Sequence, residues 1–337
     1  MSHSNISIFV PHVGCPHMCS FCNQRTITGV QEIPHADDVK RVCTQALTEI
    51  KDFHHTEIAF FGGSFTAIPR EYMLELLESA YEFVGEGKFR GIRISTRPDC
   101  INDEILITLK RYGVTSIELG AQSMSDRVLD ANKRGHTSAD VVKASEIIKS
   151  YGFELGLQMM TGLYLSTDDD DIHTMNEIIK LQPKTVRIYP VAILKETKLA
   201  EYYESGEYKL RDFDELIELC AKMLTCFYKA GIRVIRCGLH SSEALKNNMI
   251  AGFYHPAFRE ICVSRLFRNV ILKLAKQGEN TVVYVSPSSV SMAVGHKKAN
   301  RIFFDENNYN INFKVDKSLQ KDEIRIKEDV FNVFKIT

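Results

Sequence analysis

Hydrophobic positions follow two alternating patterns from residue 5 to about residue 235. Short apolar runs rich in β-branched residues predict buried strands, and longer segments with apolar residues at helical spacing predict amphipathic helices. The expected strands cover residues 6–10, 57–61, 91–95, 116–119, 154–159 and 185–189. The expected helices cover residues 37–52, 70–83, 102–112, 137–151 and 169–181.

This order repeats a strand–helix unit, which predicts a parallel sheet with helices on its outside. Six units of about 30 residues favour an α/β fold with a partial (β/α)6 barrel over the full eight-stranded barrel. Parallel α/β proteins place their ligands where the strands end, so we expect functional residues there. The residues at or just past the expected strand ends are Phe9, Gly62, Thr96, Gln122, Gln158 and Pro190.

The pattern changes in the last part of the chain. A helical stretch at 212–230 and an apolar segment at 232–237 are followed by residues 238–258, which show no clear period. A helix at 259–276, a strand at 281–285 and a tail with strand-like alternation come after them. We therefore expect a barrel domain over residues 1–240 and a smaller α/β extension over residues 241–337.

Composition indicates a globular protein of the cytoplasm. The chain has 337 residues, of which 44% are hydrophobic, and this is enough to fill a large core. No stretch approaches the roughly 18 apolar residues of a membrane helix, and the first residues lack the basic start and long apolar run of a secretory signal. We expect no contact with a membrane.

Charge is divided unevenly along the chain. Residues 241–337 carry 15 Lys and Arg against 10 Asp and Glu, a net charge of +5. Residues 1–240 carry 27 against 33, a net charge of −6. A basic extension of this kind can hold a phosphate backbone, although a solvated surface of mixed charge is the more common explanation.

Three cysteines, Cys15, Cys19 and Cys22, form a CxxxCxxC motif directly after the first expected strand. This spacing lets three thiolates meet at one metal centre, and the next cysteine, Cys43, lies inside an expected helix. An iron–sulfur cluster held by three thiolates keeps one iron open for an outside ligand. A structural zinc site is the alternative, and it needs a fourth ligand. The histidines near enough in sequence are His12, His17 and His35.

Two glycines, Gly62 and Gly63, follow the second expected strand. Glycine lets a backbone approach a ligand closely, which a zinc ribbon does not require. This turn therefore favours a cofactor site over zinc. A second metal site at Cys237, His240, His255 and Cys262 is a further hypothesis, although their spacing follows no familiar ligand pattern.

The cysteine motif, with Phe21 before its last cysteine and a Gly-Gly turn after the second strand, resembles the radical S-adenosylmethionine (SAM) superfamily. The resemblance implies that Cys15, Cys19 and Cys22 ligate a 4Fe-4S cluster and that SAM binds the open iron. It implies an enzyme that reductively cleaves SAM to a 5'-deoxyadenosyl radical. An electron donor such as flavodoxin or ferredoxin is the implied partner.

The resemblance also implies a set of cofactor contacts. Ser64 stands where the superfamily motif usually has an acidic residue, and Arg134 is expected to pair with the SAM carboxylate. Thr96, Gln122 and Gln158 are expected near the sugar, with Gln122 also near the methionine. The expected cofactor-binding residues are Phe9, Phe21, Gly62, Gly63, Ser64, Thr96, Gln122, Arg134, Gln158 and Pro190.

Further blocks resemble the catalytic subunit of Elongator and its short bacterial relatives over about residues 5–240. These blocks are TRPD at 96–99, RGHT at 134–137, MM at 159–160, RIYP at 187–190 and TKLA at 197–200. The resemblance implies modification of a wobble uridine in tRNA by an enzyme of the transferase or the oxidoreductase type, and we expect a short form without the acetyltransferase domain. We expect any tRNA contact near Lys297, Lys298 and Arg301. The alternatives are a radical SAM enzyme for a small molecule such as a porphyrinogen, and a zinc-containing binding module without catalysis.

Overall fold

The computed structural model describes residues 4–11, 19–23, 33–240 and 243–336. The chain forms two compact units, which we call the first and the second unit. The first unit consists of Met1–Leu210 and His240–Phe253, and the second of Arg211–Leu239 and Tyr254–Thr337. The expected boundary at residue 240 differs from this division and stays a prediction.

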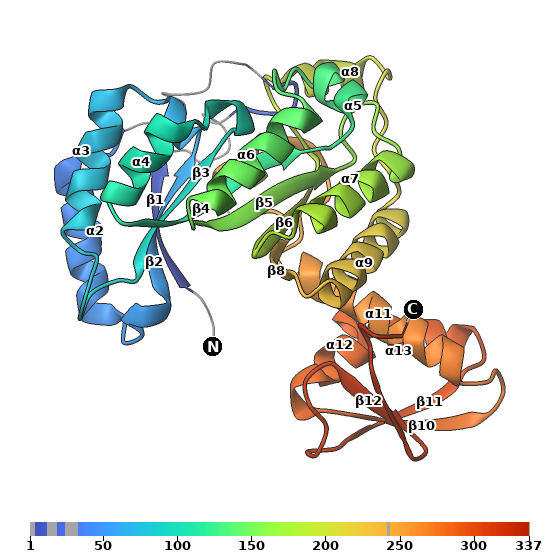
Figure 1. Cartoon of the computed structure of the whole chain (residues 1–337). Helices are drawn as coiled ribbons and strands as arrows, with labels where there is room; N and C mark the ends of the chain where they lie inside the picture. Colours follow the sequence, from blue (N-terminus) through green and yellow to red (C-terminus); the bar gives the residue numbers. More distant parts are fainter. Residues whose placement is uncertain (1–3, 12–18, 24–32, 241–242, 337) are drawn as a thin grey trace. The chain divides into compact units, whose positions relative to one another are not determined.

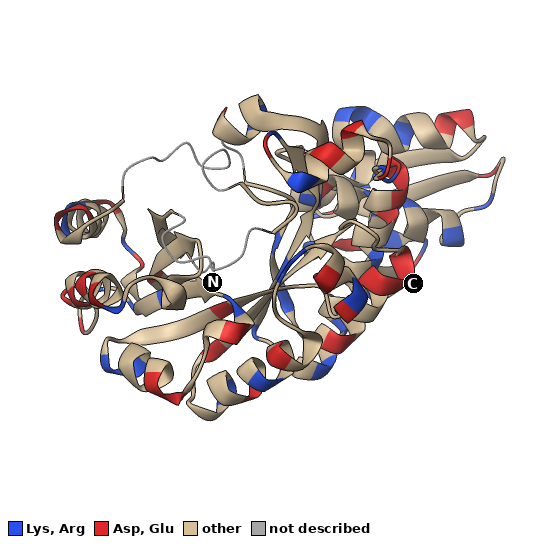
Figure 2. Cartoon of the chain, turned by 90° about the horizontal axis from the view of Figure 1, so that it is seen from above, with Lys and Arg blue, Asp and Glu red and all other residues tan. Residues whose placement is uncertain are grey.

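The first unit is built on six parallel strands in the order β1-β2-β3-β4-β5-β6. The sheet is curled, and helices cover its outer face (Figures 1 and 2). This confirms the expected partial barrel. The strands are β1 (Ser4–Val10), β2 (Thr56–Gly62), β3 (Gly91–Thr96), β4 (Val114–Gln122), β5 (Glu154–Thr161) and β6 (Thr185–Pro190).

The helices of the first unit begin where the sequence provides a start signal. α3 follows Pro69 directly, and the side chain of Asn102 accepts a hydrogen bond from Ile105 N (2.9 Å) at the start of α4. Thr137 and Thr167 form capping boxes before α6 and α7. The helices are α2 (Ala36–Glu49), α3 (Arg70–Tyr81), α4 (Asp103–Arg111), α5 (Asp126–Ala131), α6 (Ser138–Ser150), α7 (Asp168–Leu181), α8 (Lys198–Glu204) and α10 (Glu243–Asn248).

The two faces of the sheet differ in chemistry. Ile92 and Ile94 are fully buried on the face that the helices cover, and the alternate residue Arg93 points to the inner face. There Arg93 pairs with Glu57 at 2.9 Å, and both side chains are at most 1% exposed. Glu118 pairs with Arg187 at 2.7 Å on the same face. The inner face is therefore held by charged pairs, unlike the apolar faces usual for parallel sheets.

The segment 238–258, which we expected to be irregular, contains ordered elements. Within it lie α10 and the strand β9 (Met249–Gly252), and β9 pairs antiparallel with β7 (Ala192–Leu194). The expectation was wrong because elements of three to six residues show no complete period in the sequence. The short helices α5 and α8 escaped the pattern for the same reason.

The second unit combines helices with a small mixed sheet, which confirms the expected α/β extension. Its strand order is β11-β10-β12-β13, with β10 and β11 parallel and the other pairs antiparallel. The helices are α9 (Phe213–Lys229), α11 (Phe258–Leu274), α12 (Val290–Val294) and α13 (Ala299–Glu306). The strand β8 (Arg233–Cys237) is not part of the small sheet and follows β6 in the strand order of the seven-stranded sheet. The sheet strands are β10 (Asn280–Val285), β11 (Asn310–Val315), β12 (Glu323–Ile326) and β13 (Asp329–Asn332).

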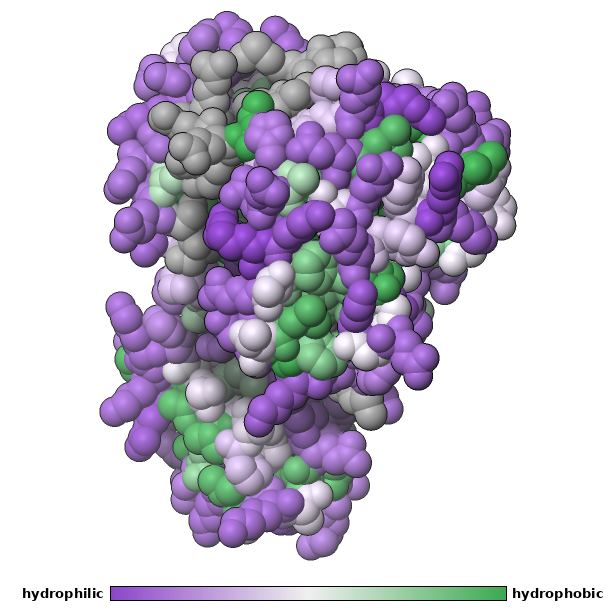
Figure 3. Space-filling model, turned by 90° about the vertical axis from the view of Figure 1, so that its left-hand side faces the viewer, coloured by the Kyte–Doolittle hydropathy of each residue, from purple (hydrophilic) through white to green (hydrophobic). Residues whose placement is uncertain are grey.

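Short 3-10 turns complete the secondary structure. They are η1 (Phe53–His55), η2 (Phe65–Ala67), η3 (Pro98–Cys100), η4 (Pro287–Ser289) and η5 (His296–Lys298). Among the described residues, no helix combines the length and the apolar character that a membrane crossing requires. The face drawn in Figure 3 is mostly hydrophilic, with separate hydrophobic patches.

Replacing Arg93 by Met is expected to lower the free energy of unfolding by about 3–5 kcal/mol, because Glu57 would keep a buried charge without its partner. The double variant Glu57→Gln/Arg93→Met should recover most of this loss, since a glutamine oxygen can still accept the Thr115 and Ser116 hydroxyls (both 2.6 Å from Glu57). Urea unfolding measures the free energy of unfolding of the single and the double variant. Arg41→Ala breaks an exposed pair with Asp38 and is the control. An Arg93→Met effect as small as that control would contradict a structural role for the buried pair.

Candidate functional site

The cysteine motif is partly described. Cys15 lies outside the described residues, whereas Cys19 and Cys22 are half-buried. The backbone N–H of Cys22 donates to Cys19 O at 3.1 Å, so the two residues share one turn. Both pack against a hydrophobic cluster that contains Phe21, which is 9% exposed. Phe21 is thus placed as a packing residue between the two cysteines.

Ser20 ties the cysteine segment to the rest of the first unit. Its hydroxyl donates to Asn132 Oδ1 at 2.7 Å, and its backbone N–H donates to Asn132 O at 3.1 Å. Its carbonyl accepts from Leu199 N at 2.7 Å, at the start of α8. The segment is therefore fixed both to the end of α5 and to α8.

Asn132 is fully buried, and its amide donates to Val128 O (2.8 Å) and Tyr164 O (3.0 Å). Neither Ser20 nor Asn132 was among the expected site residues. Asn132 could have been found from the sequence by its place two residues before the expected site residue Arg134.

Arg134 links a cysteine to a strand end. Its Nη1 donates to Cys19 Sγ at 3.0 Å, and its Nη2 donates to Gly120 O at 2.7 Å. Its Nε is buried and has no hydrogen-bond partner among the described residues. A guanidinium with a spare N–H beside a cysteine suits an anionic group such as a thiolate or carboxylate. These residues fit a metal–thiolate site with a carboxylate ligand beside it.

A second arginine holds Arg134 in place. Arg97 is 4% exposed, and its Nη2 donates to the backbone carbonyl of Arg134. The same guanidinium makes two hydrogen bonds of 2.9 Å to Asp99. Arg97 and Asp99 belong to the TRPD block that the sequence singles out, although they were not expected as site residues.

His136 lies behind Arg134 as a neutral group. It is 5% exposed, and its Nε2–H donates to Ala121 O at 3.2 Å. Burial, together with the charge of Arg134, lowers its pKa to about 4. Its Nδ1 is buried without a hydrogen-bond partner in the described part of the chain. The imidazole therefore adds no positive charge beside Arg134 at neutral pH.

Gly62 is required by the packing of β1 against β2. It has a φ of +125°, and a Cβ there would lie 2.2 Å from Val10 O and 2.9 Å from the Phe9 ring. Gly63 N donates to Val10 O at 3.1 Å. The turn thus packs closely on its neighbouring strand, and this alone explains a glycine at position 62.

Three hydroxyls join the ends of β2 and β3. Thr96 Oγ1 lies 2.8 Å from Ser64 Oγ and 2.6 Å from Thr66 Oγ1, and all three side chains are buried. Ser64 Oγ also accepts from Arg97 N at 3.2 Å. Ser64 and Thr96, both expected cofactor contacts, therefore bond to each other in this structure.

Gln122, at the end of β4, meets Gln158 on β5, so the expected place of Gln158 at a strand end is wrong. Gln158 Nε2 donates to Gln122 Oε1 at 3.1 Å. Gln122 has a φ of 66°, at a register shift in the pairing with β5. Gln158 lies three residues before the end of β5, because this strand continues to Thr161. Pro190 ends β6 and pairs with Thr161.

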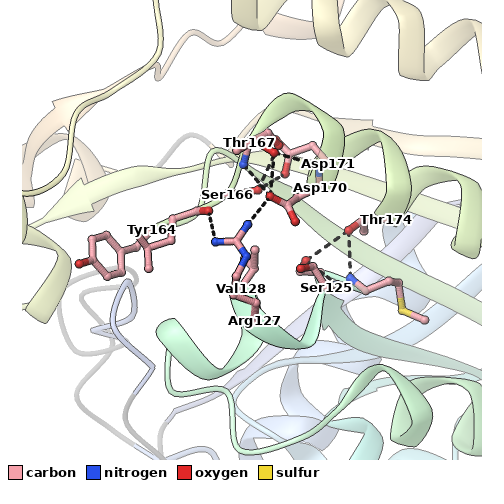
Figure 4. A network of polar contacts seen from close by, with 12 residues as sticks. Ser125, Arg127, Val128, Tyr164, Ser166, Thr167, Asp170, Asp171 and Thr174 are labelled. Atoms are coloured by element: carbon pink, nitrogen blue, oxygen red, sulfur yellow. Dashed lines mark hydrogen bonds and ion pairs between the residues drawn. The ribbon is translucent and has the colours of Figure 1, made fainter.

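A polar network locks the loops after β4 and β5 together (Figure 4). Thr174 Oγ1 accepts from Met124 N at 2.9 Å, and Arg127 Nη2 bonds to Asp170 Oδ2 at 2.7 Å. Asp171 accepts from Gly162 N (3.0 Å) and from the Ser166 hydroxyl (2.7 Å). Asp170 and Asp171, at the N-terminus of α7, therefore serve as capping and bridging groups.

The zinc alternatives find no support in the described residues. Two of the three histidines, His12 and His17, lie outside the described residues. The third, His35, precedes α2, and its Nδ1 lies 3.1 Å from Oε1 of Glu75 on α3. Within the described ranges, no group of three or more His, Cys, Asp or Glu could hold a metal ion. The hypothesis of a second metal site at Cys237, His240, His255 and Cys262 is therefore wrong for the structure as described. Cys237 and Cys262 are buried, and hydrogen bonds from Cys220 and Cys262 lower the pKa of Cys237.

Comparison with known families gives two matches that together span most of the chain. The family described as "Radical SAM superfamily" matches residues 9–178. The family described as "Radical_SAM C-terminal domain" matches residues 183–268.

Three relatives are similar to this chain at modest identity. An uncharacterized protein of Methanocaldococcus jannaschii is 29% identical over 64% of the chain and 65% of its own length. The tRNA uridine(34) acetyltransferase of the same organism is 30% identical over 48% of the chain and 34% of its own length. Elongator complex protein 3 of Bos taurus is 31% identical over 65% of the chain and 44% of its own length. The chain thus covers less than two thirds of each relative.

Two solved structures share the fold. The archaeal Elp3 of Methanocaldococcus infernus, with an N-terminal deletion, has a TM-score of 0.65 and 21% identity, and the match covers 80% of this chain and 64% of that one. Coproporphyrinogen III oxidase from Escherichia coli has a TM-score of 0.50 and 13% identity over 80% of this chain and 76% of that one. At these identities the likeness concerns the fold.

His136 is expected to make the stability of the first unit depend on pH. The unfolded histidine titrates near 6.5 and the folded one near 4, so its contribution is complete above pH 6.5 and is lost as the pH falls toward 4. The loss is about 1.4 kcal/mol per pH unit. Urea unfolding between about pH 7 and pH 5 should show the stability advantage of the native protein over His136→Gln shrinking. His173→Gln, at an exposed position, is the control. A constant difference would contradict the lowered pKa.

Proposed function

The chain belongs to the radical SAM superfamily, and we propose that it uses the chemistry of this superfamily to modify transfer RNA at a uridine of the wobble type. Membership implies an enzyme with a 4Fe-4S cluster and SAM. The observation that carries the RNA proposal is the likeness to proteins named tRNA uridine(34) acetyltransferase and Elongator complex protein 3, at 30% and 31% identity. The chain spans 34% and 44% of the length of those two proteins.

We assign the cofactors to the residues that the sequence indicates. Cys15, Cys19 and Cys22 would hold the cluster, and Arg134 would place its spare N–H toward the SAM carboxylate. The proposed SAM contacts are Phe9, Phe21, Gly62, Gly63, Ser64, Thr96, Gln122, Gln158 and Pro190. When bound, the two cofactors supply one-electron cleavage of a carbon–sulfur bond, which yields a primary carbon radical able to remove a hydrogen atom.

The inner face of the first unit suits a polar substrate. Arg187 Nη1 donates to Tyr189 OH at 3.2 Å, and its guanidinium carbon lies 5.0 Å from the centre of the Phe61 ring. Tyr189 is half-buried near the end of β6. Aromatic faces and fixed donors near a strand end can stack and hydrogen-bond a nucleobase. This arrangement supports a nucleoside as the substrate of the site.

We further propose that an electron carrier such as a flavodoxin or ferredoxin reduces the cluster. The chemistry requires one electron for each SAM cleaved, which a carrier of this kind supplies.

Replacing Cys15, Cys19 or Cys22 by Ala is expected to abolish both iron binding and release of 5'-deoxyadenosine, because each removes a cluster ligand. Cys226→Ala, a half-buried cysteine of α9, is the matched control and should retain both. Iron and sulfide analysis of anaerobically purified protein and chromatography of the SAM products give the measurement. Undiminished 5'-deoxyadenosine from the three variants would contradict the assignment.

The RNA substrate is tested by adding bulk tRNA to the reduced enzyme with SAM. We expect faster SAM cleavage and a new modified uridine in the nucleosides recovered from the tRNA, detected by mass spectrometry. A matched mixture with the Cys19→Ala variant controls for modifications already present. If tRNA causes no faster SAM cleavage and no new nucleoside is found, the RNA proposal is overturned, while superfamily membership stays intact.

A further inference from the structure

The small sheet of the second unit has one covered and one open face. Val283, Val285, Ile324 and Ile326 are at most 7% exposed, and they lie on the covered face. Helices α11, α12 and α13 lie on one side of this sheet (Figure 1). The ring of Phe313 on β11 is 6.4 Å from that of Phe304 on α13, which places Phe313 on the covered face as well.

The alternate residues form a row across the open face. Tyr284 on β10 pairs with Lys314 on β11 and with Arg325 on β12, and Arg325 pairs with Val330 on β13. Paired residues on adjacent strands place their side chains next to each other on one face. We call these four residues the cross-sheet row. Lys314 and Val330 are exposed, and Tyr284 and Arg325 are half-buried.

An aromatic ring with a guanidinium group over it lies at the centre of the cross-sheet row. The guanidinium carbon of Arg325 is 4.0 Å from the centre of the Tyr284 ring. Arg325 Nη2 also bonds to Asp316 Oδ2 at 2.7 Å. Hydrogen bonds from Ser318 and Arg325 lower the pKa of Asp316 to about 2, so this carboxylate is charged at neutral pH. Asp316 thus holds Arg325 over the ring and offsets its charge.

Lys314 supplies positive charge that is not offset. It forms no ion pair with any residue in the described ranges. Residues 241–337 as a whole carry 15 Lys and Arg against 10 Asp and Glu. The open face therefore joins an aromatic–guanidinium pair to an exposed cation.

We infer that the cross-sheet row binds a single-stranded segment of RNA, with a base stacked on the Tyr284–Arg325 pair and a phosphate at Lys314. Open sheet faces with aromatic side chains and arginine planes are a common way to hold unpaired bases. This inference rests on the proposed function, because it names the part of the chain that holds the RNA substrate. Base stacking favours unpaired strands over duplexes, whose bases are already stacked.

The absence of tryptophan from the chain offers a direct probe. Tyr284→Trp places a single indole in the row, and a single-stranded oligoribonucleotide is expected to quench its fluorescence. A duplex of the same sequence, and inorganic phosphate at equal concentration, should leave this fluorescence unchanged. Tyr228→Trp, at a 43% exposed position on α9, is the matched control and should respond to none of the three.

Substitutions separate the ring from the charge. Tyr284→Ser should weaken RNA binding about ten-fold or more, whereas Tyr284→Phe keeps the ring and should bind like the native chain. Lys314→Ala should reduce the slope of log affinity against log salt by about 0.7, the value for one phosphate contact on a single strand. Lys276→Ala, at an exposed position of the same unit, is the control. Circular dichroism checks that each variant is folded.

The outcomes distinguish this inference from the function on which it rests. Quenching at position 284 with the expected loss in Tyr284→Ser supports the row, even if no tRNA modification is found. Modification of tRNA with no quenching and unchanged affinity of the Tyr284 and Lys314 variants overturns the row and leaves the function standing. Equal quenching by duplex, single strand and phosphate also overturns it, because stacking would then contribute nothing.

Discussion

The buried pairing of carboxylates with guanidinium groups on the inner face of the half-barrel is the constraint on which the first unit depends. Charges in a dry interior are tolerated only when they are paired and hydrogen-bonded. Glu57 and Arg93 join β2 to β3, and Glu118 on β4 reaches Arg187 on β6 across β5. On β5, which lies between β4 and β6, Gly156 pairs with Glu118. A Cβ at position 156 would lie only 3.4 Å from the Glu118 side chain. The glycine leaves room for the pair, and the pair fixes three strands at once.

Strands fixed in this way give the site its geometry. Glu118 is followed two residues later by Gly120, whose carbonyl accepts from Arg134. Arg134 in turn reaches Cys19, while Asn132 holds Ser20 at the other side of the same segment. The cysteine segment therefore takes its position from the sheet through the loop that follows α5. A short motif can bind a metal centre reproducibly only when other residues hold it, and here these residues come from more than 100 positions later in the chain.

The sequence predicted the six strands and the long helices of the first unit because each spans enough residues to show a full period. It did not predict the contact between Ser20 and Asn132, since a hydrogen bond across 112 positions leaves no local pattern. Ser64 and Thr96 show a different difficulty. Their place at the strand ends was predictable, but their bond to each other depends on how β2 and β3 are paired. In the second unit the alternation of the tail was visible, whereas the row around Tyr284 follows from a register that only the structure provides.

Charge and shape assign different tasks to different parts of the chain. Residues 1–240 have a net charge of −6 and residues 241–337 a net charge of +5, so net charge favours a polyanion only in the latter segment. Phosphate contacts of that kind carry no sequence information. Under the proposed function, selection of the base falls to the inner face of the first unit, where Arg187, Tyr189 and Phe61 present a fixed donor and aromatic groups. Under the proposed function and the inferred RNA contact, RNA binding and base discrimination would therefore depend on different residues.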